Sequence, residues 1–116
     1  MSLWQPRADL HAHSRCSDGT MTPEEVIRQA DLAGLDVFSL TDHDTVAGIQ
    51  PALDEIARLE SPLELLTGAE LTCYDAAGRE WHMLAYGFDH RNPRVTGFLE
   101  ARVREREARI HRILEK

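Results

Sequence analysis

The sequence contains only two cysteines, Cys16 and Cys73, among its 116 residues. They form neither a disulfide framework nor a Cys-x-x-Cys metal pair, and free thiols suit a reducing compartment, so we expect a cytoplasmic protein. No apolar run approaches the roughly 18 residues of a membrane span, and the first residues lack the apolar middle of a signal peptide. These absences exclude the small disulfide-rich proteins and predict no membrane association.

Basic residues are also scarce, because 13 Lys and Arg stand against 20 Asp and Glu, for a net charge of −7. Non-specific affinity for nucleic acid comes mostly from Lys and Arg that neutralise phosphates, so this balance argues against an extended nucleic-acid surface. A short nucleic-acid end or a small anion remains open as a ligand. Glycine-rich and proline-rich tracts are missing as well, and 42% of the residues are apolar, which predicts one small globular domain.

What the sequence does contain is a clear alternation of apolar runs and amphipathic segments. Thr22-Pro23-Glu24-Glu25 is a capping box with proline at the first helical position, which predicts a helix that stops at Gly34. A second helix is expected from about Val46 to Leu59, closed by Ser61-Pro62. Strands are expected at residues 8–11, 35–40 and 63–66, and residues 71–74 and 80–86 flank a hairpin or tight connection at residues 75–78.

Asn92 and Pro93, a helix cap and a first-turn proline, begin a segment of different character, in which apolar residues recur at helical spacing among dense Arg and Glu. This pattern predicts one long amphipathic helix over residues 92–116, after a motif-bearing core over residues 8–89. Both charge signs occur from Arg102 to Arg112 at spacings that pair along a helix, which favours a solvated face over a nucleic-acid patch. The apolar stripe ends uncapped, so we expect a truncated chain whose helix packs on a missing C-terminal part or on another subunit.

The order strand, helix, strand, helix, strand implies parallel strands with right-handed crossovers. The carboxyl ends of such strands meet on one face, where the chemistry of α/β proteins is found. Candidate residues follow these ends: His11 and His13 leave the first strand, Asp18 lies in its loop, His43 leaves the second strand, Glu70 leaves the third, and His82 lies on the strand after the hairpin.

These side-chain types indicate a metal centre. Residues i and i+2 of an extended segment point the same way, so His11 and His13 can present two imidazoles to one ion. Alone, this pair fits a structural role equally well, because histidine is also an ordinary, partly buried polar residue. Three strand ends that each deliver His or Glu favour metal binding over satisfied core polar groups. His90 and His111 lie in polar, non-strand context and are not expected to be ligands.

Four motifs, in order, resemble the PHP (polymerase and histidinol phosphatase) family of metal-dependent phosphoesterases. They are Asp9-Leu-His-Ala-His-Ser14 with Ser17-Asp18-Gly19 and Thr22-Pro23-Glu24, then Leu40-Thr41-Asp42-His43-Asp44, then Gly68-Ala69-Glu70, and last His82-Met-Leu-Ala-Tyr-Gly87. The resemblance covers about residues 8–89. Within the family, the chain is most similar to the bacterial branch that acts on 3′,5′-nucleotide bisphosphates and on the 5′ ends of short RNA.

The resemblance implies a distorted seven-stranded β/α barrel with up to three divalent metals. His11 and His13 would ligate one metal, Glu70 would bridge it to a second metal also held by His82, and Asp18 and His43 would take the third. Asp42 and Asp44 would be outer-sphere carboxylates that fix imidazole tautomers. The family's later ligands and four of the seven strands are missing from the sequence, so residues 1–116 resemble the N-terminal part of a PHP domain.

The implied chemistry is phosphate-ester hydrolysis by a metal-activated hydroxide, for which Glu70, His43 and Asp18 would be the catalytic set. Mixed imidazole and carboxylate ligands suit Mn²⁺, Fe²⁺ or Zn²⁺. Arg15 is a candidate for gripping a second phosphate, although an ordinary exposed arginine fits equally well. Cys16 lacks a base and is expected to be incidental. A histidinol-phosphate-type phosphatase, a proofreading exonuclease and an inactive metal-binding fragment remain alternative hypotheses.

Overall fold

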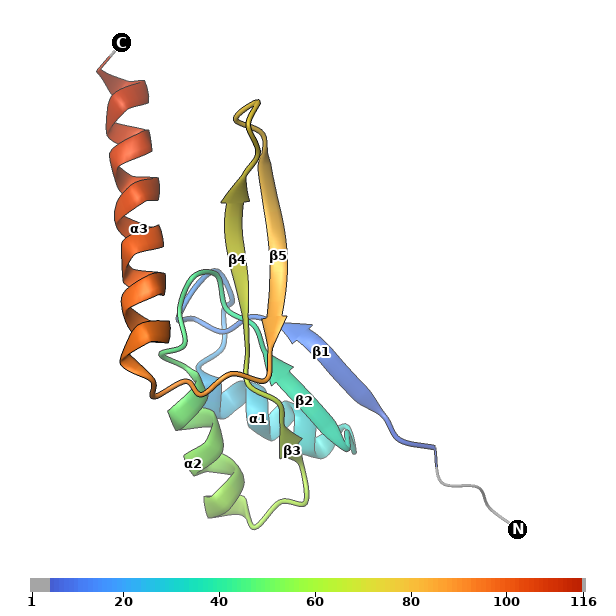
Figure 1. Cartoon of the computed structure of the whole chain (residues 1–116). Helices are drawn as coiled ribbons and strands as arrows, with labels where there is room; N and C mark the ends of the chain where they lie inside the picture. Colours follow the sequence, from blue (N-terminus) through green and yellow to red (C-terminus); the bar gives the residue numbers. More distant parts are fainter. Residues whose placement is uncertain (1–4, 116) are drawn as a thin grey trace.

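The computed structural model describes residues 5–115, in which strands and helices alternate before a hairpin and one long helix (Figure 1). The elements are β1 (Ala8–Ala12), α1 (Pro23–Leu32), β2 (Val37–Leu40), α2 (Ile49–Leu59), β3 (Glu64–Leu65), β4 (Gly68–Tyr74), β5 (Glu80–Tyr86) and α3 (Pro93–Leu114). β1, β2 and β3 form a parallel sheet in that order, and β4 and β5 form an antiparallel hairpin. The predicted α/β organisation with a long final helix is confirmed, and no helix within residues 5–115 has the length and apolarity to cross a membrane.

The core lies between the parallel sheet and the helices α1 and α2. Phe38 and Leu40 point from β2 to this side and meet Ile27 of α1 and Ala52 of α2, all buried. Thr22 caps α1 as predicted, because its Oγ1 accepts a hydrogen bond from the Glu25 amide at 3.2 Å. This packing fixes the positions of β1 and β2, whose carboxyl ends lead into the candidate residues.

The helix α2 begins at Ile49, three residues later than the predicted start at Val46. The reason is Pro51, which has no amide hydrogen to donate within a helix interior and is tolerated only in the first turn. A start at Ile49 places Pro51 in that turn, whereas a start at Val46 would leave the carbonyl of Ala47 without its helical partner. The Thr45 hydroxyl instead accepts from the Ala47 amide at 3.1 Å and holds a turn before the helix.

The strand β4 extends the polar end of the sheet, and this corrects the prediction that Glu70 follows the end of the third strand. Glu70 is inside β4, and its amide donates to the carbonyl of Asp42 at 3.0 Å while its own carbonyl accepts from the Asp44 amide at 3.0 Å. A parallel bridge therefore joins Glu70 to His43 beyond the end of β2. Gly68 permits this close approach, since a Cβ there would lie 2.9 Å from the Thr41 Cγ2 atom.

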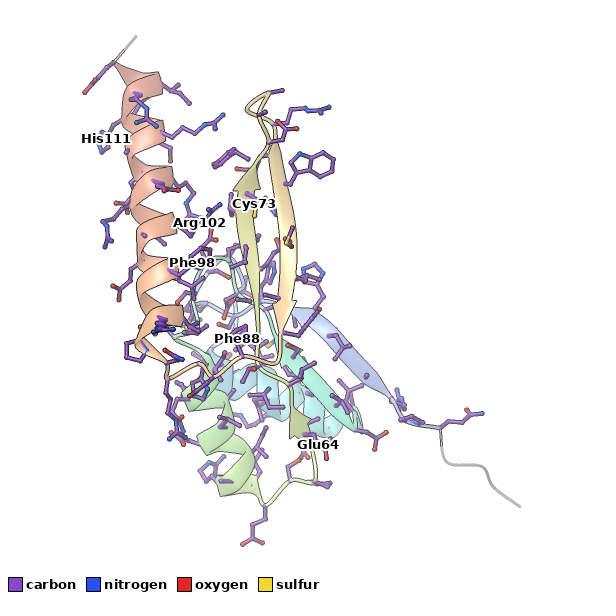
Figure 2. The ribbon with its side chains drawn as sticks, in the orientation of Figure 1. Glu64, Cys73, Phe88, Phe98, Arg102 and His111 are labelled. Atoms are coloured by element: carbon purple, nitrogen blue, oxygen red, sulfur yellow. The ribbon has the colours of Figure 1, made fainter. Side chains whose placement is uncertain are left out.

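The long helix α3 stands beside the β4–β5 hairpin (Figures 1 and 2). Asn92 caps it as predicted, accepting from the Arg94 amide at 2.9 Å. Leu99 is its one buried residue among those described, whereas Phe98 and Ile113 are at least half exposed. The charged segment is not merely solvated, because arginines from it contact the hairpin and the loop after β2, as described below.

Candidate metal centre

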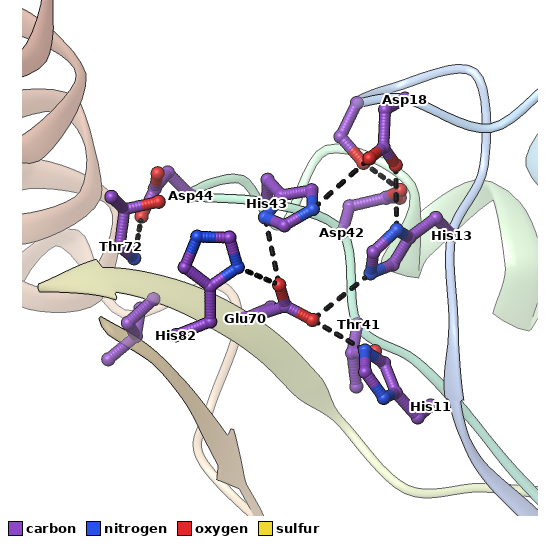
Figure 3. Close-up of polar contacts among 12 residues, drawn as sticks. His11, His13, Asp18, Thr41, Asp42, His43, Asp44, Glu70, Thr72 and His82 are labelled. Atoms are coloured by element: carbon purple, nitrogen blue, oxygen red, sulfur yellow. Dashed lines mark hydrogen bonds and ion pairs between the residues drawn. The ribbon is translucent and has the colours of Figure 1, made fainter. Parts of the chain in front are cut away.

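All six predicted ligands converge at the polar end of the sheet, around the buried carboxylate of Glu70 (Figure 3). Glu70 Oε1 lies 2.5 Å from His11 Nε2 and 3.3 Å from His13 Nε2. Its other oxygen, Oε2, lies 2.7 Å from His82 Nδ1 and 3.1 Å from His43 Nδ1. One carboxylate with a 5% exposed side chain is therefore surrounded by four imidazoles, which come from β1, the residue after β1, the loop after β2, and β5.

The second carboxylate, Asp18, lies on the open side of the cluster. Its two oxygens lie 2.6 Å from His13 Nδ1 and 3.2 Å from His43 Nε2, so these two rings stand between Asp18 and Glu70. The Asp18 side chain is 60% exposed, against about 20% for each of the two rings. The cluster is thus anchored at its buried carboxylate and open to solvent at its other one.

The ligand atoms divide into three groups, within each of which all atoms lie within 4.8 Å of one another. The groups are His11, His13 and Glu70; His13, Asp18 and His43; and His43, Glu70 and His82. Glu70, His13 and His43 each belong to two groups, which is the arrangement expected where neighbouring metals share ligands. Each of the three pairs implied by the sequence resemblance lies within one group, and the role of these residues as metal ligands stays a prediction.

The electrostatics of the cluster favour charged carboxylates. Burial alone raises the pKa of Glu70, but hydrogen bonds from His11 and His82 and the nearby His43 outweigh it and lower that pKa below its ordinary value. The pKa of Asp18 is lowered in the same way, with desolvation opposed by its contacts to His13. Hydrogen bonds to Glu80 and then Glu70 raise the pKa of His82. Cations bound among these groups would take the place of the imidazole N–H donors as partners of both carboxylates.

A family model described as the PHP domain matches residues 9–112. This chain belongs to the PHP domain family. A 5′-3′ exoribonuclease from Haemophilus influenzae is 41% identical over 108 residues, which cover 93% of this chain and 38% of that protein. A 3′,5′-nucleoside bisphosphate phosphatase from Chromobacterium violaceum is 37% identical over 105 residues, which cover 90% of this chain and 34% of that protein.

A solved structure supports the same assignment. It is an amidohydrolase from Chromobacterium violaceum with bound sulfate and no metal, and it superposes with a TM-score of 0.76 at 33% identity. The match covers 94% of this chain and 36% of that one. The PHP chain therefore spans little more than a third of the length of the relatives it matches.

The two predicted outer carboxylates, Asp42 and Asp44, form no hydrogen bond to an imidazole among residues 5–115 of this PHP chain, so they do not fix an imidazole tautomer by direct contact as the sequence resemblance implied. Asp42 is 2% exposed and accepts hydrogen bonds from the Ser14 amide, the Ser14 hydroxyl and the Ser17 hydroxyl, at 2.6 to 2.7 Å. It holds the loop that carries Asp18. Asp44 accepts from the Thr72 amide at 2.9 Å and pairs with Arg106, so its carboxylate faces β4 and α3.

The remaining sequence candidates lie around or away from the cluster. Arg15 is exposed in the Asp18 loop, and its guanidinium donates to the Thr20 carbonyl at 3.0 Å. Cys16 is an exposed free thiol that belongs to none of the ligand groups among residues 5–115. His90 contacts Gln50 at 3.0 Å, and His111 is on the exposed surface of α3, away from the hairpin (Figure 2).

Two contacts at the centre were missed by sequence reasoning. Glu80 Oε2 lies 3.2 Å from His82 Nε2, so the ring of His82 stands between two carboxylates. The Tyr86 hydroxyl donates to the Leu10 carbonyl at 2.5 Å and ties β5 to β1 beside His11. Alternation along β5 places Glu80 and His82 on one face, which was the available signal for Glu80. The Tyr86 contact joins residues 76 apart and has no local signal.

Proposed function

We propose that this chain is the N-terminal part of a distorted seven-stranded PHP barrel, and that the full protein is a cytoplasmic metal-dependent phosphoesterase. Its proposed substrates are phosphate esters of nucleotides, either a 3′,5′-nucleotide bisphosphate or the 5′ end of a short RNA. The observation that carries the proposal is the set of three overlapping ligand groups, two of which share Glu70. The names of the exoribonuclease and bisphosphate phosphatase relatives support the substrate class.

The donor set fits divalent first-row metals. Four imidazoles and two carboxylates suit Mn²⁺, Fe²⁺ or Zn²⁺ better than Mg²⁺ or Ca²⁺, which favour all-oxygen shells. When bound, such metals supply Lewis acidity toward phosphate oxygens and lower the pKa of water. Six side chains cannot complete about four or more positions on each of three ions, so water or ligands from the rest of the protein must contribute.

The residues of this chain have separable roles in the proposal. Glu70 places both carboxylate oxygens within reach of two ligand groups and bridges them, because its side chain is buried and fixed by β4. His13 and His43 are shared between groups and keep them adjacent, with ring centroids 4.5 Å apart. Asp18 is 60% exposed, which leaves its side of the cluster open to substrate. Arg15, in the same exposed loop, is proposed to bind a substrate phosphate through its guanidinium.

The proposal is tested by phosphate release from a 3′,5′-nucleotide bisphosphate and nucleotide release from a 5′-phosphorylated short RNA. The full-length protein is assayed with Mn²⁺ and with chelator, beside this segment alone. We expect turnover by the full-length protein only with metal, loss of turnover in Glu70→Gln, and near-normal turnover in the matched Cys16→Ala variant. Turnover that survives chelation, or that is lost with Cys16 and not with Glu70, would contradict the proposal.

The alternative functions are separated by the same assay. Preferential release of phosphate from histidinol phosphate would assign the histidinol-phosphate-type activity, and preferential removal of 3′-terminal deoxynucleotides would assign a proofreading exonuclease. Metal binding by this segment without turnover by either form would assign a non-catalytic metal-binding role. The nucleotide proposal stands only if the bisphosphate or the RNA 5′ end is the best substrate.

A further inference from the structure

Asp44 is a buried charge in an unusual backbone conformation next to the candidate ligand His43. Its φ angle is 53°, in the left-handed region that residues other than glycine seldom adopt, and the residue is 3% exposed. The amide of Asp44 donates to the Glu70 carbonyl, and its Oδ1 accepts from the Thr72 amide at 2.9 Å. The loop after β2 is therefore held against β4 through Asp44, one residue beyond the imidazole of His43.

The remaining oxygen of Asp44 is paired with α3. Arg106 Nη1 lies 2.7 Å from Asp44 Oδ2, and the two residues are 62 positions apart in the sequence. Two further arginines lie along the same side of α3: Arg102 donates to the Thr72 carbonyl, and Arg109 stacks 4.1 Å over the ring of Tyr74. Of these three arginines, Arg106 is the one that contacts the neighbour of a candidate metal ligand.

From this geometry we infer that Arg106 is a positioning residue for His43, acting through Asp44. Without Arg106, the Asp44 carboxylate would keep one amide donor and lose its counter-charge in a site with 3% exposure. The left-handed turn at Asp44 sets the direction of the preceding residue, so relaxation of that turn displaces the His43 ring. The inference rests on the proposed metal centre, which His43 joins to both carboxylates.

The matched control is Arg109, one turn further along α3. Its guanidinium donates to the Gly78 carbonyl at 3.0 Å at the hairpin tip, remote from His43. Arg109→Met therefore removes one arginine from the same side of the same helix and loosens the hairpin without touching Asp44. Any effect of general helix undocking or lost charge is shared by Arg106→Met and Arg109→Met, whereas an effect carried by Asp44 belongs to Arg106→Met alone.

The first measurement uses the metal-free chain, followed by the amide signals of His43 and Asp44 in a two-dimensional nitrogen–proton NMR spectrum. We expect Arg106→Met to shift both signals and Arg109→Met to shift those near Gly78 and leave His43 in place. Arg106→Gln is the second variant if Arg106→Met does not fold, with the same expected shifts. Unshifted His43 and Asp44 signals in the folded Arg106 variant would overturn the inference.

The second measurement is the affinity of the chain for Mn²⁺, obtained by calorimetric titration. We expect Arg106→Met to weaken Mn²⁺ binding by about tenfold or more, as for other outer-sphere partners of metal ligands, with most of the loss restored in Arg106→Lys. Equal affinities for Arg106→Met and Arg109→Met would overturn the inference. If the unaltered chain binds no Mn²⁺, the proposed function is decided by the assay of the full-length protein, and the amide shifts still decide the role of Arg106.

Discussion

The clearest quantitative prediction concerns Asp42, whose carboxylate holds the loop that carries Asp18. Asp42→Ala removes the acceptor for three hydrogen bonds, two of them from Ser14, which is fully buried. A buried group left without its partner costs about 1–3 kcal/mol. Ser17 is half-buried and regains a water partner, so the two Ser14 groups set the loss. We therefore expect Asp42→Ala to lower the free energy of unfolding by roughly 2–6 kcal/mol.

Asp42→Asn separates the shape of this residue from its charge. The amide oxygen still accepts from the Ser14 amide and the Ser17 hydroxyl, and the Ser14 hydroxyl turns to accept from the new NH₂ group. The loss then consists of charge assistance and of the acceptor of the Ser14 hydroxyl proton, about 1–3 kcal/mol in all and smaller than the loss for Asp42→Ala. Urea unfolding of the metal-free chain at neutral pH measures both variants. Equal losses for Asn and Ala, or a loss below about 1 kcal/mol for Ala, would refute the hydrogen-bond account.

Three further predictions rest on single residues. Gly68→Ala should lower the unfolding free energy by about 1–3 kcal/mol in urea, because its Cβ would crowd Ser39 and Thr41; an unchanged midpoint would contradict the close approach of β4. Hydrogen bonding to Arg58 lowers the pKa of Glu55 from 4.5 to about 2, so its stabilisation is present above pH 4.5 and is lost as the pH falls toward 2. Glu55→Gln should flatten the acid-unfolding curve in that window, and a curve of unchanged slope would count against the ion pair. Asp18→Asn, at an exposed position, should change the unfolding free energy by less than about 0.5 kcal/mol yet weaken Mn²⁺ binding in a calorimetric titration; unchanged affinity would remove Asp18 from the centre.

The parts of the fold that local chemistry controls were predictable. The Thr22 cap, the Asn92 cap and the alternation of strands with helices all depend on residues close together in the sequence, and the structure confirms them. The predicted start of α2 at Val46 was wrong because it rested on apolar spacing and left Pro51 in the helix interior. Pro51 has no amide hydrogen and is therefore restricted to the first turn.

The convergence of four of the candidates was predictable because parallel strands bring their carboxyl ends together, and these four are His11, His13, Asp18 and His43. Glu70 and His82 join them from inside the antiparallel strands β4 and β5. The partners of Asp42 and Asp44 were not predictable, because they depend on contacts with residues far away in the sequence. Ser14 lies 28 positions from Asp42, and Arg106 lies 62 positions from Asp44. The charge pattern of α3 was compatible with a solvated face, and only the packing of α3 beside β4 shows that Arg106 serves a buried carboxylate.

The most direct test of the metal centre is a Zn²⁺ titration of the chain followed through the imidazole NMR signals of all six histidines. We expect the signals of four histidines to shift with Zn²⁺, because their rings surround Glu70; they are His11, His13, His43 and His82. The signals of His90 and His111 serve as internal controls and should stay in place, since both rings lie outside the ligand groups. Shifts confined to His90 and His111, or no shift in the four imidazoles around Glu70, would contradict the proposed metal centre.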